Sequence, residues 1–204
     1  MQRNSTMKRT FGCVLFLVLV AATVRGSGSQ ATTSQQATIP QDDLKDFQSR
    51  VQKYLAIQKK AAGSVSSLHK GVTDAALIVN HQHQMADAIR ALRPNPVQGE
   101  IFTPWLRGTL TAAVKGQVQG KAGTDAKATI LGEGNPKSPE SPSPSKITLN
   151  GEYPPKAPLS TVPPRVLMAL PTLPEGLEYR FVGRTLILRD TRADIVVDIL
   201  PNAF

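Results

Sequence analysis

The stretch from Leu177 to Leu200, LEYRFVGRTLILRDTRADIVVDIL, limits what this 204-residue chain can fold into more than any other part of it. Two turn sequences divide it into three segments of strand length. The first turn is Gly183-Arg184, where glycine suits the positive φ of a type II′ hairpin. The second, Asp190–Asp194, is longer. The stretch therefore predicts a three-stranded antiparallel β-meander.

The first turn determines how the first two strands pair. Val182 faces Thr185. A one-residue shift of this register would mix apolar and charged side chains on both faces of the sheet. The apolar face is covered by some other part of the chain, because so small a sheet is marginal in water by itself. The predicted pairs that follow are Phe181–Leu186, Arg180–Ile187, Tyr179–Leu188 and Glu178–Arg189.

The second turn places Asp190 opposite Ile195. A regular ladder from that pair predicts Leu188 opposite Val197 and Leu186 opposite Ile199. The other face is then only partly polar, and we interpret part of it as a possible surface for a protein partner. Asp198 lies on this face, and the residues of the possible partner surface are Arg180, Ile187, Val196 and Leu200.

The N-terminus has the pattern of a secretory signal peptide over residues 1–28. Lys8 and Arg9 precede the apolar run Phe11–Ala22, and small residues follow it. The run is shorter than the roughly 20 residues that span a bilayer, so we expect no stable membrane span after cleavage. The only cysteine, Cys13, lies in this leader. The pattern predicts a periplasmic or secreted protein.

Composition indicates a modest core with long irregular connections. The chain is 40% hydrophobic but only 5% aromatic, with 16 prolines and 15 glycines. Its net charge is +9, and removal of the four cationic residues of the leader leaves 20 against 15 acidic residues, or +5. The basic residues form no compact run interleaved with aromatic residues, so no nucleic-acid partner is expected.

The rest of the chain divides by pattern. We expect a disordered N-terminus at 29–40, a helical region of about three helices at 41–118, a Gly/Pro/Ser-rich linker at 119–160, and a short helix plus the meander at 161–204. The first helix is predicted to end at Gly63, the second to begin after a Thr73 cap, and the third to begin at Thr103-Pro104. The predicted fold class is α+β: a small N-terminal helical bundle, a Pro/Ser-rich linker and a C-terminal three-stranded antiparallel β-meander.

No residue pattern indicates catalysis. The histidines are His69, His81 and His83, and neither a Gly-x-Ser-x-Gly nor a His-Glu-x-x-His pattern occurs. His81 and His83 point roughly 200° apart on a helix, so they cannot share a metal ion. We predict that the protein is not an enzyme, with no catalytic, cofactor-binding or metal-binding residue and no cofactor.

Three segments resemble an uncharacterised family of exported bacterial proteins. They are DFQSRVQKYLAIQKK, AIRALRPNPVQGEIFTP and the tail from Pro158 to Phe204, whose core is LPTLPEGLEYRFVGRTLILRD. The resemblance implies a location in the envelope or outside the cell and supplies no catalytic residue. The hairpin YRFVG–LILRD is also similar to small periplasmic metal-homeostasis proteins.

These observations favour a non-enzymatic structural or protein-interaction role in the cell envelope, with a possible protein partner there. The alternative is a periplasmic metal-responsive accessory protein. The oligomeric state is left open.

Overall fold

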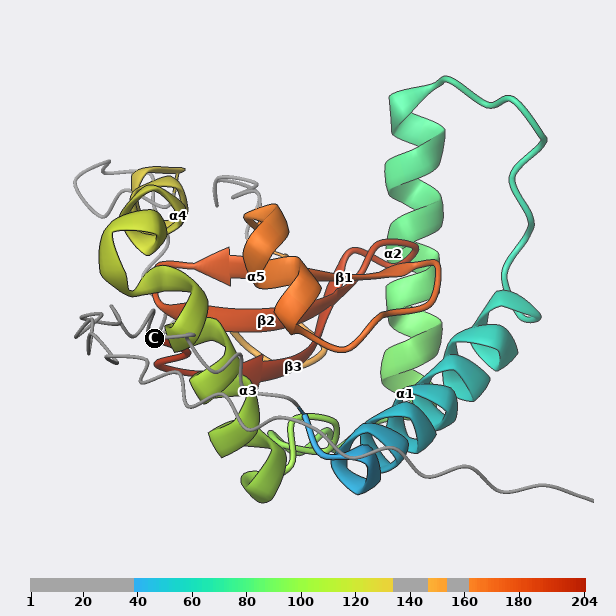
Figure 1. Ribbon diagram of the computed structural model, residues 1–204. Helices are drawn as coiled ribbons and strands as arrows, with labels where there is room; N and C mark the ends of the chain where they lie inside the picture. The colour runs from blue at the N-terminus through green and yellow to red at the C-terminus, as the bar shows by residue number, and fades with distance from the viewer. Residues whose placement is uncertain (1–38, 134–146, 154–161) are drawn as a thin grey trace, which may run out of the picture. The chain divides into compact units, whose positions relative to one another are not determined.

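The computed structural model describes residues 39–133, 147–153 and 162–204 (Figure 1). All of them belong to the unit Ser34–Phe204. They form five helices and a three-stranded antiparallel sheet, which confirms the α+β class. The predicted signal peptide, the segment 29–38 and much of the predicted linker lie outside the described residues.

Helix α1 (Gln41–Ala62) forms where the apolar spacing predicted it. Phe47, Val51, Tyr54 and Ala61 are buried and follow one another at helical intervals, so a single face meets the core. Acidic residues occupy the first turn and lysines the last, and both interact favourably with the helix dipole.

Helices α2 (Ala75–Leu92) and α3 (Pro104–Val118) also lie where they were predicted. The cap of α2 is Asp74 rather than Thr73, and its carboxylate accepts a hydrogen bond of 2.8 Å from the amide of Ala76. Pro104 is at the first position of α3, where its missing N–H costs nothing. Among the described residues, no helix combines the length and apolarity needed to cross a bilayer.

The predicted linker 119–160 is wrong at its start, because helix α4 occupies Gly120–Glu133. Ala126 and Ile130 of α4 are buried in the core. Gly123 is also buried, and a Cβ there would lie 2.4 Å from the backbone carbon of Val118, so glycine allows α4 to fold back against the end of α3. These small residues hide the helical period, and tertiary packing stabilises a helix that local propensity does not predict.

The sheet consists of β1 (Leu177–Val182), β2 (Thr185–Asp190) and β3 (Ile195–Leu200), in that order. Every predicted pair between β1 and β2 is confirmed, from Val182 opposite Thr185 to Glu178 opposite Arg189. The turn residue Gly183 has the positive φ, 57°, that its position requires.

The pairing of β2 with β3 was predicted only in part. Asp190 faces Ile195 as expected, but a β-bulge follows, and Leu188 faces Asp198 rather than Val197. Leu186 consequently faces Leu200 rather than Ile199. The bulge adds one residue to β3, which turns Asp198 and Leu200 to the face that carries Leu186 and Leu188.

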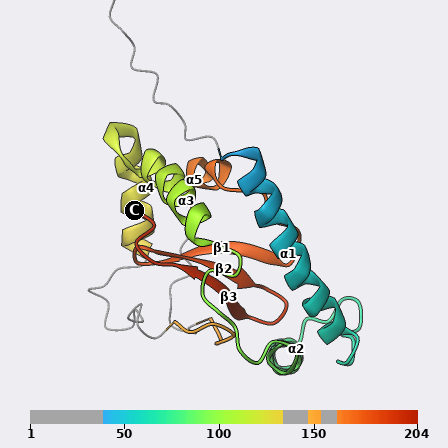
Figure 2. The same ribbon diagram turned by 90° about the horizontal axis from the view of Figure 1, so that it is seen from below.

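The helices and the sheet share one core rather than forming a bundle and a separate meander. Figure 2 shows α1, α3, α4 and α5 (Pro164–Ala169) over one face of the sheet. Apolar side chains from each of the five helices and from all three strands join one cluster; α5 contributes Val166. The apolar face of the meander is therefore covered, as predicted, and α5 is part of the cover.

Residues 147–153 cover the opposite face of the sheet. Ile147 and Tyr153 pack there against Val182, Ile187 and Val196. This segment also pairs with the outer edge of β3, through hydrogen bonds that join the backbones of residues 150, 151 and 153 to those of residues 194 and 196. This second part of the predicted linker therefore packs against the sheet and is bonded to its edge.

Candidate functional site

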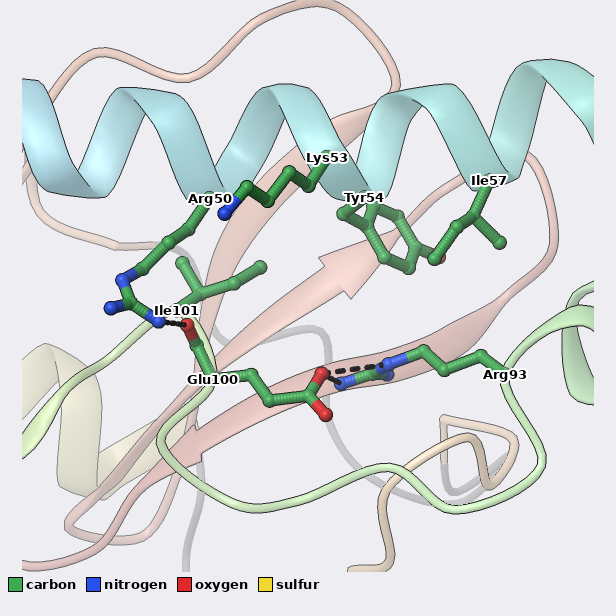
Figure 3. Close-up of a pocket in the computed structure, with 7 residues that line it drawn as sticks. All are labelled: Arg50, Lys53, Tyr54, Ile57, Arg93, Glu100 and Ile101. Carbon is green, nitrogen blue, oxygen red and sulfur yellow. Dashed lines mark hydrogen bonds and ion pairs between the residues drawn. The ribbon is translucent and has the colours of Figure 1, made fainter.

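A small pocket opens between α1 and the connection that follows α2 (Figure 3). It encloses about 170 Å³, enough for one charged side chain or a small anion. Three basic side chains converge on it against one acidic side chain. Its lining residues are Arg50, Lys53, Tyr54, Ile57, Arg93, Glu100 and Ile101.

Helix α1 supplies the wall that carries the unpaired charge. Arg50, Lys53, Ile57 and Lys60 follow at intervals of three or four residues, so they form one stripe along the helix. Arg50 donates to the Asp46 carboxylate and to the main-chain oxygen of Glu100, both at 2.8 Å. The exposed ammonium of Lys53 has no anionic partner in the parts of the chain that the structure describes. We name Arg50, Lys53 and Lys60 the α1 cationic stripe.

Arg93, at the end of α2, has a structural role in the opposite wall. Its Nε and Nη2 donate to Oε2 of Glu100 at 2.9 and 2.5 Å. Nη1 donates to Oδ1 of Asn150 at 2.9 Å, and Nη2 also reaches the main-chain oxygen of Val197 at 3.2 Å. With every guanidinium nitrogen occupied and 7% of the residue exposed, Arg93 joins α2 to the sheet rather than serving a ligand.

Tyr54 forms the back of the pocket and points its hydroxyl away from it. The hydroxyl donates a 2.7 Å hydrogen bond to Asp190, and the Arg93 guanidinium lies 5.8 Å from the centre of its ring. Burial raises the pKa of Tyr54 far above its ordinary value, and the charge of Asp190 raises it further. Tyr54 is therefore a neutral donor at physiological pH, not a group that exchanges protons with a ligand.

The pocket can bind an anionic group electrostatically. Glu100 pairs with Arg93 and Asp46 pairs with Arg50, so Lys53 is the cation at the opening that has no anionic partner among the described residues. Lys53, with Arg50 beside it, attracts a carboxylate, and the apolar walls formed by Ile57 and Ile101 accept the methylene groups behind it.

The structure separates the four residues of the predicted partner surface. Ile187 and Val196 are fully buried beneath the segment 147–153, and Leu200 is buried on the opposite face because of the bulge. Arg180 alone among the four is partly exposed, and its Nη2 donates to Glu178 at 2.7 Å. The expected half-polar open face therefore does not exist in the part of the chain that the structure describes, and Arg180 is the one residue of the four that can still contact a partner.

The histidines occupy separate surroundings. His83 Nε2 lies 3.7 Å from Oε1 of Glu152, an approach that the sequence did not suggest. His81 borders a different pocket of about 290 Å³ that also includes Ile78 and Met85. Within the described ranges, no group of three or more His, Cys, Asp or Glu side chains is placed to hold a metal ion.

Sequence reasoning missed the pocket itself. One signal was available: from Phe47 to Ala62, α1 carries four basic residues and no acidic one. Arg50, Lys53, Lys59 and Lys60 therefore predict a basic helix surface. The opposite wall was not predictable, because tertiary packing brings Arg50 to the main-chain oxygen of Glu100, 50 residues later.

The chain matches no protein-family model, no curated protein and no solved structure.

Proposed function

We propose that this is an exported bacterial protein with a non-enzymatic, protein-interaction role in the cell envelope, where it binds an acidic segment of a partner protein. The observation that supports this proposal is the α1 cationic stripe beside a pocket with apolar walls. The lysine at its centre, Lys53, is exposed and has no anionic partner among the described residues.

The dimensions of the stripe define the partner segment. Lys53 and Lys60 are seven residues apart, a separation of about 10 Å along a helix at 1.5 Å per residue. A partner helix with acidic residues two turns apart matches this spacing. A polyproline II segment with acidic residues three positions apart also matches it, because that helix has three residues per turn and places both on one side. One carboxylate enters the pocket between Arg50 and Lys53, and a second meets Lys60.

The leader pattern, in which Lys8 and Arg9 precede the apolar run Phe11–Ala22, supports export. A fusion of residues 1–40 to alkaline phosphatase tests it, because that enzyme is active only outside the cytoplasm. Activity that disappears when Lys8 and Arg9 are replaced by glutamate and the run is interrupted by arginine supports export. An inactive fusion contradicts it.

Binding is tested with a fluorescent peptide that carries glutamates seven residues apart in a helix-forming background. We expect the peptide to bind, and added salt to weaken the binding. The matched control peptide has glutamine at those positions. Equal binding of the two peptides, or no binding, contradicts the proposal.

Two charge reversals locate the site. Lys53→Glu should weaken binding by about tenfold or more, which corresponds to about 1.4 kcal/mol. Lys115→Glu makes the same change on an exposed position of α3 and should leave binding unchanged. Equal losses in the two variants indicate non-specific attraction. Tighter binding to vesicles of anionic lipid than to the peptide assigns the stripe to a membrane surface instead.

The metal-responsive alternative stays a prediction, and the approach of His83 to Glu152 is the observation in its favour. Two such side chains complete only half of a typical zinc site. Calorimetric titration with nickel, copper and zinc tests it. Heat that disappears in His83→Ala but not in His69→Ala supports the alternative, and absence of heat removes it.

A further inference from the structure

A second and larger pocket, of about 440 Å³, lies beside strand β1. One wall is formed by four consecutive residues of β1, from Leu177 to Arg180. The opposite wall is apolar and includes Val162, Leu167 and Leu173. At its rim Leu167 is 50% exposed, and its neighbour Met168 is 76% exposed.

The pocket runs along the edge of the sheet rather than over one face. Successive side chains of a strand point to opposite faces, so a cavity that touches four in a row must lie beside the strand. In the described parts of the chain, β1 has a hydrogen-bonded neighbouring strand on one side only, β2. The pocket therefore lies between the outer edge of β1 and the segment that contains α5.

The backbone of Tyr179 is directed to this edge. Antiparallel pairs alternate between hydrogen-bonded and non-hydrogen-bonded positions. The amide of Thr191 donates to the oxygen of Gly176, and by alternation Glu178 and Arg180 also bond to β2. The N–H and C=O of Tyr179 consequently point away from β2, as does the amide of Leu177, which donates to Pro174.

Arg180 adds a polar donor to the pocket wall. Its Nε is buried and has no hydrogen-bond partner among the described residues. A buried donor without a partner destabilises the free protein, and it gains an acceptor only when binding of a ligand opens the site around it. Burial opposes ionisation of Glu178, but hydrogen bonds from Arg180 and Arg189 outweigh it and lower the pKa of Glu178, so this carboxylate stays charged and orients Arg180.

We propose that an extended, apolar segment of a partner protein binds as an additional strand beside β1. Its backbone pairs with Tyr179, one apolar side chain enters the pocket between Leu167 and Leu173, and a carbonyl oxygen accepts from Nε of Arg180. Main-chain pairing supplies affinity and the pocket supplies selectivity, as in other cases of strand addition. The charges of Glu178, Arg180, Arg189 and Asp194 balance one another here, so a neutral segment fits better than a charged one. This site does not depend on the α1 cationic stripe.

The experiment uses the full chain and a displayed library of random twelve-residue peptides. We expect the selected peptides to have alternating apolar residues and to slow hydrogen exchange at the amide of Tyr179. Replacement of their pairing N–H groups by N-methyl groups should abolish binding, because side chains stay the same and strand pairing is lost.

Two leucines that are both 50% exposed provide matched variants. Leu167→Lys should weaken binding of the selected peptides by about tenfold or more, because it puts a charge in the apolar wall. Leu77→Lys on α2 should leave binding within about twofold of the original. The proposal is overturned if no selected peptide depends on Leu167, if bound peptides leave exchange at Tyr179 unchanged, or if N-methylated peptides bind equally well.

Discussion

The phenolic oxygen of Tyr54 lies 2.7 Å from Oδ2 of Asp190, and this hydrogen bond joins α1 to β2 across 136 residues of sequence. Asp190 is fully buried and also accepts from Gln58 at 2.8 Å and from the amides of Arg192 and Ala193. One carboxylate thus ends the strand, holds the following turn and anchors the first helix. Charge–dipole bonds of this kind are stronger than bonds between neutral groups.

Tyr54→Phe tests that anchor. The substitution removes one donor from a buried carboxylate that keeps its three other donors, so we expect the free energy of unfolding to fall by about 2 kcal/mol. Urea unfolding followed by circular dichroism measures the change. Ser49→Ala, at an exposed position of the same helix, should alter stability by less than about 0.5 kcal/mol. A Tyr54→Phe protein as stable as the Ser49→Ala protein would show that Asp190 does not need the hydroxyl.

Alkaline pH should destabilise the protein through its tyrosines. Burial raises the pKa of Tyr54 and of Tyr179 in the folded chain far above the ordinary value of about 10. Above that pH the unfolded chain releases these protons while the folded chain keeps them. Stability is therefore complete below about pH 10 and decreases as the pH rises, by about 1.4 kcal/mol per pH unit for each tyrosine.

Urea unfolding at several pH values between about 9 and 11 measures this slope. Tyr179→Phe lowers stability at every pH, because it removes the 2.9 Å hydrogen bond to the oxygen of Pro171. It should also make the loss of stability with rising pH less steep, because one of the two tyrosines no longer contributes to it. An unchanged slope in that variant is the result that contradicts the assignment to Tyr179.

Asp198, within β3, has an equivalent role towards the connection that follows α2. It is fully buried and accepts from the amides of Gly99, Ile101 and Phe102, each at 2.8 Å. Asp198→Asn keeps the shape but turns an NH₂ group towards these donors, so we expect a loss of about 3 kcal/mol. Asp125→Asn, at an exposed position of α4, is the control in the same unfolding measurement. Similar stabilities of the two variants would show that the connection after α2 holds its shape without the carboxylate.

The pairing of β1 with β2 was predictable because its determinants are local. The two-residue turn at Gly183 fixes the register, and each pair beyond it sorts apolar from charged side chains. The bulge in β3 was not predictable, because Val196 and Val197 are both apolar and either could face the core. Because the bulge was not expected, Asp198 and Leu200 were assigned to the wrong face of the sheet. The predicted partner surface included Leu200 for this reason, and the structure does not bring its four residues together on one open face.

Long-range packing explains the other differences. The glycines of Gly120–Glu133 lower its helix propensity and its small residues give little apolar period, and the burial of Ile130 in the core is a tertiary property. The candidate pocket likewise combines residues of α1 with Arg93 and Glu100, which no local pattern relates. The basic residues of α1 could have indicated its basic surface, but no local pattern indicates the carbonyl and carboxylate that face it.

Phe181→Ala tests the covered face of the sheet. Phe181 is 1% exposed, and its ring meets the ring of Phe204 edge-on with centroids 5.7 Å apart. Removing a buried aromatic side chain should cost about 3–5 kcal/mol, because the cavity cannot fully collapse. Met168→Ala, at a position that is 76% exposed, is the control. A shift below about 0.5 kcal/mol in urea unfolding would mean that the helices do not cover this face.

Deletion of Val197 tests the bulge. Without this residue a regular ladder places Val196, Asp198 and Leu200 opposite Arg189, Leu188 and Leu186, the same pairs as in the intact chain. The shortened protein should therefore fold, with a loss of about 3 kcal/mol from one buried valine and from the acceptor of the Arg93 hydrogen bond. A nuclear Overhauser contact between Leu186 and Leu200 checks the pairing. Deletion of Ile199 is the control, because it moves Leu200 to the opposite face and should prevent folding. If the two deletions are equally damaging, the bulge itself is required for the twist of the sheet.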